Sequence, residues 1–168
     1  MKHEKVWKFG NNINTDIISP PAYLELSVED AKKYTMEPVD PNFASNYKPG
    51  DIVVAEHNMG SGSSRETAPL TLKALGVRFI VAMDFARIFY RNCINVGILP
   101  IECKQTDKIS TGDLIHVDYV NGKIHNEANG EVYECSRIPD HIMDIAECGG
   151  LIEYIKQKRL NNNTTTGR

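Results

Sequence analysis

The spacing of hydrophobic residues divides the first hundred positions into strands and helices. Four short apolar runs have the length of buried strands: residues 6–9, 51–56, 77–83 and 98–101. Between the last three runs the spacing becomes helical, over residues 63–76 and again over residues 85–95. On the first of these helices, Ala68, Leu72 and Leu75 share one face. The alternation of strand and helix predicts an α/β fold with a mixed, partly parallel sheet and flanking helices.

Polar residues and a glycine predict where these helices begin and end. Ser27 and Asp30 have the spacing of a capping box for a short helix that ends before Pro38. Asp84 is expected to cap the helix over residues 85–95, because a carboxylate accepts hydrogen bonds from first-turn N–H groups. Gly97 suits the left-handed conformation just past the end of that helix.

The last third of the chain has an antiparallel pattern. Residues 114–120 alternate, and Asn121-Gly122 is a two-residue hairpin signal, with a second turn expected at Asn129-Gly130. A final helix is expected over residues 151–158. The tail over residues 161–168, NNNTTTGR, has no apolar residue to pack and is predicted to be disordered. We expect a single domain over residues 1–160.

Composition and charge exclude several classes of function. The 168 residues carry 19 Lys and Arg against 22 Asp and Glu, a formal charge of −3, so no basic excess favours nucleic acid as a partner. The most apolar stretch, residues 79–83, is far shorter than the roughly 20 residues that cross a bilayer. The first ten residues lack the apolar core of a secretory signal. We expect a cytoplasmic protein with no membrane contact.

The cysteines and histidines do not form a metal-binding pattern. The four cysteines have no pair at the two-residue spacing that presents two thiolates from one turn: Cys93, Cys103, Cys135 and Cys148. The five histidines lack the spacing of a helical zinc site. We expect this chain to bind no metal, so another chain would supply the ligands for any metal chemistry.

Two polar loops are candidates for chemistry. Residues 10–16, GNNINTD, are too rich in turn formers for a regular element, which leaves turn geometry or function as the reason for them. Residues 58–66, NMGSGSSRE, join a buried strand to a helix, where N–H groups favour an anion. The hydroxyls of Ser63 and Ser64 and the planar fork of Arg65 suit a carboxylate or phosphate. A glycine turn with a serine cap remains the alternative.

Three segments carry a resemblance to a known family. They are GDIVVAEHNMGSGSSRETAPLTLKALGV, FARIFYRNCINVGILPI and FGNNINTDIISPPAYL. Their order and distances resemble the small subunit of 3-isopropylmalate dehydratase, in the aconitase superfamily. The resemblance implies a swivelling β/β/α domain that closes over a larger catalytic subunit. In that division of labour the large subunit carries a four-iron four-sulfur cluster, which acts as a Lewis acid, and the small chain is inert alone.

The resemblance also implies roles for individual residues. Ser63 matches the catalytic base, which removes a proton while a malate-type substrate is dehydrated and rehydrated. Ser64 and Arg65 match residues that bind a substrate carboxylate. The Asn14-Thr15-Asp16 triplet would shape the pocket. Thr67 stands where relatives have histidine, which removes any contribution of an imidazole.

A serine hydroxyl needs strong support to act as a base, because it is much less acidic than a thiol. A helix amino terminus contributes on the order of 1 kcal/mol, which is less than the roughly 1.36 kcal/mol of one pKa unit. We expect backbone donors near Ser63, the Arg65 guanidinium and the exclusion of water to supply the rest.

The segment Tyr23-Leu24-Glu25-Leu26 bears on the choice of substrate. Homoaconitase relatives resemble Tyr-Leu-Arg here, where a guanidinium binds the extra carboxylate. Glu25 would repel that carboxylate, and Leu24 and Leu26 could face an alkyl group, which favours isopropylmalate. The alternatives are dimethylmalate, citramalate or homoaconitase-type substrates, a non-catalytic anion-binding module, and a Glu25 that points to solvent and selects nothing.

Overall fold

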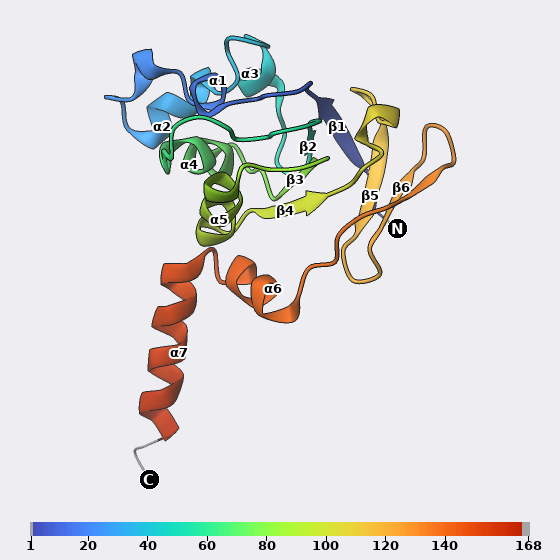
Figure 1. Ribbon diagram of the computed structural model, residues 1–168. Helices are drawn as coiled ribbons and strands as arrows, with labels where there is room; N and C mark the ends of the chain where they lie inside the picture. Colours follow the sequence, from blue (N-terminus) through green and yellow to red (C-terminus); the bar gives the residue numbers. More distant parts are fainter. Residues whose placement is uncertain (1, 166–168) are drawn as a thin grey trace.

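The structure is a computed structural model, and it describes residues 2–165. Its strands form a seven-stranded mixed sheet in the order β4-β3-β2-β1-β5-β6-β7 (Figure 1). The strands are β1 (Glu4–Lys8), β2 (Ile52–Val54), β3 (Phe79–Ala82), β4 (Leu99–Glu102), β5 (Leu114–Asp118), β6 (Lys123–Asn126) and β7 (Val132–Glu134). The helices are α1 (Thr15–Ile18), α2 (Val28–Ala31), α3 (Phe43–Asn46), α4 (Thr67–Ala74), α5 (Arg87–Val96), α6 (Asp140–Glu147) and α7 (Leu151–Thr165), with single 3-10 turns η1 (Pro21–Tyr23), η2 (Lys32–Tyr34) and η3 (Thr106–Lys108).

Strand β1 joins a parallel half of the sheet to an antiparallel half. It pairs in parallel with β2, which continues through β3 to β4, and antiparallel with β5. The hairpin strands β5, β6 and β7 complete the antiparallel half. The α/β class, the mixed sheet and the antiparallel hairpin region expected from the sequence are therefore confirmed.

The parallel strands are apolar throughout because both of their faces are buried. On one face, Val53 and Ile80 pack with Leu72 of α4 and Phe89 of α5 in the first hydrophobic core. On the other face, Ile52, Val54, Phe79 and Val81 pack with residues of β5, β6, β7 and α6 in the second core. The antiparallel strands with α6 thus cover one face, and helices α4 and α5 cover the other, which gives the expected β/β/α layers.

Two predicted helix starts are wrong, and both lie near the polar loops. Helix α4 begins at Thr67 with Glu66 as its N-cap, so Ser63 lies in the preceding loop and not in the helix. Helix α5 has Ala86 as its N-cap, and Asp84 does not cap it. The Asp84 carboxylate accepts instead from the backbone N–H of Asn58 at 2.6 Å. Competition from the neighbouring loop decided where this carboxylate bonds.

Two other residues begin or end a helix as the sequence predicts. The Ser27 hydroxyl accepts from the backbone N–H of Asp30 and caps α2. Gly97 ends α5 with a φ of 91°, a conformation that glycine adopts without steric cost. The loop over residues 10–16 is only partly irregular, because Asn14 caps the one-turn helix α1.

The antiparallel half confirms two turns but changes the length of one. Asp118 pairs with Lys123, so the β5–β6 hairpin has a four-residue loop in place of the predicted two-residue loop. The second turn joins β6 to β7 as expected. Helix α6 was not predicted from the sequence.

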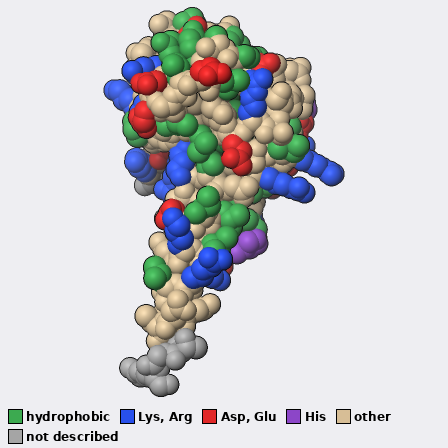
Figure 2. Space-filling model, turned by 90° about the vertical axis from the view of Figure 1, so that its left-hand side faces the viewer, with side chains coloured by type: hydrophobic (Ala, Val, Ile, Leu, Met, Phe, Trp, Pro, Cys, Tyr) green, Lys and Arg blue, Asp and Glu red, His purple; other side chains and the backbone are tan. Residues whose placement is uncertain are grey.

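Helix α7 extends further than predicted and projects from the body of the molecule (Figure 1, Figure 2). It runs through residues 161–165, which were expected to lack regular structure, and residues 166–168 lie outside the described part of the chain. The Thr164 hydroxyl donates to the carbonyl oxygens of Leu160 and Asn161 within the helix. No helix of residues 2–165 combines the length and the apolar character that a membrane span requires.

We predict that Ile80→Ala lowers the free energy of unfolding by about 2–5 kcal/mol, because the side chain is fully buried between β3 and the helices. Val120→Ala is the control, since Val120 is 67% exposed, and a change of about 0.5 kcal/mol or less is expected. Urea denaturation of the two variants checks this. Equal losses would show that the first hydrophobic core does not determine stability.

Candidate functional site

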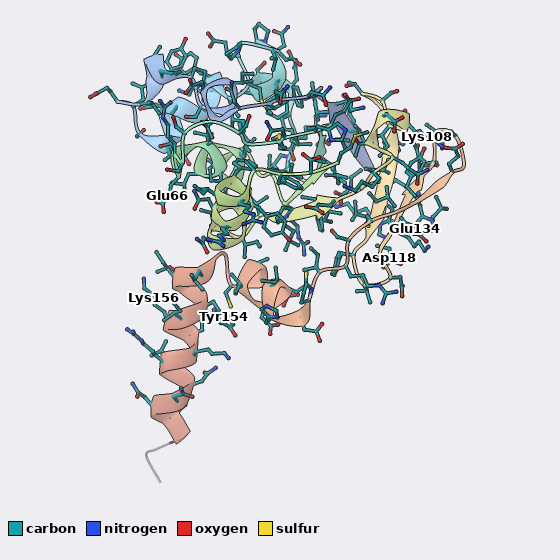
Figure 3. The ribbon with its side chains drawn as sticks, in the orientation of Figure 1. Glu66, Lys108, Asp118, Glu134, Tyr154 and Lys156 are labelled. Atoms are coloured by element: carbon teal, nitrogen blue, oxygen red, sulfur yellow. The ribbon has the colours of Figure 1, made fainter. Side chains whose placement is uncertain are left out.

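A cavity lies at the carboxyl end of the parallel strands, where loops from separate parts of the chain meet. Its volume is about 200 Å³. The start of α1, the loop after β2 and the residues from Ala86 to Asn92 at and after the start of α5 all contribute to its wall. The lining residues are Thr15, Gly60, Gly62, Ser63, Ser64, Arg65, Ala86, Arg87, Ile88, Phe89 and Asn92. In Figure 3, Glu66 marks the end of the loop that carries these serines, and Lys108, Asp118 and Glu134 mark the antiparallel half on the opposite side.

Close contact between backbones positions the loop over residues 58–66, called the serine loop below. The N–H of Gly60 donates to the carbonyl of Ile13 at 2.7 Å, and the N–H of Thr15 donates to the carbonyl of Ser61 at 2.9 Å. Gly60 has a φ of 82°, and a Cβ at this position would lie 2.0 Å from the ring of Phe89. Only glycine lets the loop pass this close to α5.

Helix α1 contributes a cap, a buried hydroxyl and a carboxylate. Asn14 Oδ1 accepts from the N–H of Ile17 at 2.9 Å and holds the helix start. Thr15 is 2% exposed and lines the cavity, and its buried Oγ1 has no hydrogen-bond partner among the described residues. Asp16 Oδ1 accepts from Arg65 Nη1 at 2.8 Å, so this ion pair joins α1 to the serine loop.

The Asp84 carboxylate holds the start of the serine loop, a role that the sequence did not predict. Asp84 follows β3 and accepts from both the backbone N–H of Asn58 and Nδ1 of His57, each at 2.6 Å. The bond from His57, followed by the bond from Asn58, lowers the pKa of the Asp84 carboxyl. Asn58 itself adopts a left-handed φ of 61°. The carboxylate therefore stabilises a strained turn that leads into the serine loop.

The helix start that lines the cavity belongs to α5, and no residue of α4 is among the lining residues. Ser63 lies four positions before Thr67, the first residue of α4, and the effect of a helix dipole falls off within one turn. Ala86, the N-cap of α5, lines the cavity, and no side chain caps this end. The prediction that Ser63 lies at the start of the following helix is therefore wrong. A parallel strand followed by a helix was the sequence signal that could have located this end.

The structure brings together some of the predicted site residues and leaves others apart. Thr15, Ser63, Ser64 and Arg65 line the cavity. Asn14 and Asp16 support it through the bonds of α1. The segment over residues 24–26 does not line it, and within that segment Leu24 is half-buried whereas Glu25 and Leu26 are exposed.

The cysteines of this chain do not fit a metal cluster. Within residues 2–165, no group of three or more His, Cys, Asp or Glu side chains is placed to hold a metal ion. Burial raises the pKa of the Cys93 and Cys103 thiols and raises that of Cys135 to about 12, which disfavours the thiolate that a metal binds.

Comparison with known proteins places this fold and cavity in a class. The family model described as the aconitase C-terminal domain matches residues 11–106. A small subunit 1 of 3-isopropylmalate dehydratase from Archaeoglobus fulgidus is 47% identical over 92% of this chain and 97% of its own. The small subunit of 3-isopropylmalate dehydratase from Nautilia profundicola is 48% identical over 94% and 96%.

A third relative and a solved structure agree with this class. The isopropylmalate/citramalate isomerase small subunit of Methanocaldococcus jannaschii is 47% identical over 92% of this chain and 93% of its own. A crystal structure of a 3-isopropylmalate dehydratase from the same organism superposes with a TM-score of 0.91 and 35% identity, covering 97% and 98% of the two chains. The chain belongs to the family of 3-isopropylmalate dehydratase small subunits.

We predict that Gly60→Ala lowers the free energy of unfolding by about 1–3 kcal/mol more than Gly130→Ala does. Both glycines have positive φ, but a Cβ at Gly130 meets no atom within 4 Å, whereas one at Gly60 overlaps Phe89. Thermal unfolding of the two variants separates the overlap from the backbone strain. A smaller loss at Gly60 would show that the loop does not depend on this close approach.

Proposed function

We propose that this chain is the small subunit of a heteromeric hydro-lyase that interconverts 2-isopropylmalate and 3-isopropylmalate by dehydration and rehydration. That reaction belongs to leucine biosynthesis in the cytoplasm. One observation carries the proposal: Thr15, Ser63, Ser64 and Arg65 line one cavity in a chain of this family. The names of the relatives favour an enzyme subunit over a non-catalytic anion-binding module.

The charges of the cavity favour a substrate with carboxylates. Among the described residues that line it, there are two guanidinium groups, from Arg65 and Arg87, and no carboxylate. The chain as a whole has a formal charge of −3, so this positive site is local. In our proposal Ser64 and Arg65 bind one substrate carboxylate through hydroxyl and guanidinium donors.

Ser63 is proposed as the base that takes a proton from the carbon next to the hydroxyl-bearing carbon. The Ser63 side chain is exposed, so water solvates its hydroxyl in this chain alone. The first residue of the helix that follows, Thr67, lies four positions further along the chain. An alkoxide forms only where closure removes that water and donors surround the oxygen. A large partner subunit would supply this closure, so we expect the isolated chain to be inactive.

The four-iron four-sulfur cluster is proposed to belong to the large subunit. The cysteines of this chain are buried or half-buried, burial raises the thiol pKa of Cys93, Cys103 and Cys135, and within residues 2–165 they are not grouped as ligands. In this proposal, this chain supplies the base and the carboxylate-binding groups, and it brings them to the large subunit.

The apolar wall of the cavity supports an alkyl-substituted substrate. Ala86, Ile88 and Phe89 form that wall, and Ile88 is 54% exposed. In our proposal Leu24 and Leu26 approach the substrate only when the partner closes. Citramalate is the second candidate, because one relative is named an isopropylmalate/citramalate isomerase small subunit.

We predict that Ser63→Ala lowers kcat by about 10²–10⁴-fold in the enzyme reassembled anaerobically with its large subunit, because the proton acceptor is lost. The unfolding midpoint should not change, since the side chain is exposed. Ser110→Ala is the matched control, on an exposed loop outside the cavity, and should retain full activity. Absorbance of the unsaturated intermediate measures the rate, and parental activity of Ser63→Ala would exclude this base.

We predict that Glu25→Arg changes the ratio of kcat/KM for a tricarboxylate to that for isopropylmalate by about tenfold in favour of the tricarboxylate, because a repulsive charge becomes an attractive one. Glu29→Arg, at another exposed glutamate of the same region, is the control for net charge. An equal ratio in the two variants would show that Glu25 takes no part in selection.

A further inference from the structure

The cavity contains one cation that is already paired and one that is not. Arg65 Nη1 donates to Asp16 at 2.8 Å. Arg87, from the first turn of α5, lines the same cavity and is exposed. It takes part in none of the ion pairs or side-chain hydrogen bonds that the structure gives for residues 2–165. Its guanidinium therefore has no internal partner.

Two further observations at the same cavity call for an external acceptor or donor. Thr15 lines the cavity, and its buried hydroxyl has no hydrogen-bond partner within residues 2–165, although buried polar groups are nearly always hydrogen-bonded. The amino-terminal end of α5 meets the cavity at Ala86 without a side-chain cap, so its N–H groups favour negative charge there. With Arg87 on the same helical turn, these groups match the oxygens of a bound anion.

We propose that Arg87 is a substrate-binding residue that holds the second carboxylate of a 2-alkylmalate. This inference rests on the proposed function. A malate derivative carries two carboxylates, and Ser64 with Arg65 is assigned to one of them. One N–H of Arg65 donates to Asp16, which fixes the direction of the Arg65 guanidinium. The guanidinium of Arg87 has no such bond within residues 2–165, so all its donors can take part in a planar, bidentate contact. The two guanidiniums then bind opposite ends of the substrate, with the apolar wall between or beside them.

The chain offers a matched control one turn further along α5. Arg91 is exposed like Arg87, but it does not line the cavity of Ser63. Both arginines line a neighbouring hollow with Phe85, Tyr90 and Glu102, so only Arg87 reaches both hollows. Replacing either arginine removes one exposed positive charge from the same helix. Any difference between the two variants therefore reports position and not net charge.

The test uses the enzyme reassembled with its large subunit, as wild type, Arg87→Gln, Arg87→Lys and Arg91→Gln. Equilibrium dialysis measures the affinity for 2-isopropylmalate, and initial rates give kcat and KM separately. We expect Arg87→Gln to weaken affinity and raise KM by about tenfold or more, the usual effect of losing a charge-assisted hydrogen bond. Arg87→Lys should restore part of the affinity, because it keeps the charge without the fork. Arg91→Gln should stay within about twofold of wild type.

The outcomes separate this inference from the proposed function. Affinity of Arg87→Gln equal to that of wild type, or equal to that of a weakened Arg91→Gln, overturns the inference even if the enzyme is active. Binding of 2-isopropylmalate without turnover by the wild-type enzyme overturns the proposed function, and a selective loss of binding in Arg87→Gln still supports the role of Arg87. A wild-type enzyme that neither binds nor converts this compound overturns both.

Discussion

The site depends on the close approach of two loops at the carboxyl edge of the parallel strands. The loop after β1 and the loop after β2 exchange backbone hydrogen bonds through Gly60, Ile13, Thr15 and Ser61. These bonds form only because Gly60 lets the chain pass against Phe89. The polar lining residues are carried by these two segments and by α5, so the mutual distance of the three sets the geometry of the whole site.

A local excess of donors follows from this arrangement. The lining has guanidinium, hydroxyl and amide groups and, within the described residues, no carboxylate. The nearby acids are engaged elsewhere: Asp16 pairs with Arg65, and Asp84 with His57 and Asn58. Because neither carboxylate lines the cavity, the site can attract anions although the protein as a whole is acidic.

Local sequence patterns predicted most of the strands and helices. They failed for polar side chains, such as Asp84, that can form hydrogen bonds with more than one part of the chain. The apolar runs located β1 to β4 because a strand buried on both faces must be apolar throughout. Asp84 was expected to cap α5, yet it bonds to Asn58, which a sequence pattern cannot rank against a cap because the partner lies 26 residues earlier. The start of α4 was placed too early for a similar reason, since the glycine loop is held by contacts with α1.

The sequence by itself determined the order of strands and helices from β2 to β4, the serine and arginine loop and the family, because these follow from periodicity and from residues adjacent in the chain. Only the tertiary structure decided that Arg87 shares the cavity of Ser63, and that residues 24–26 do not line it. The physical reason is that a cavity is formed by the meeting of distant segments. Their distances depend on packing and on hydrogen-bond competition across the whole fold.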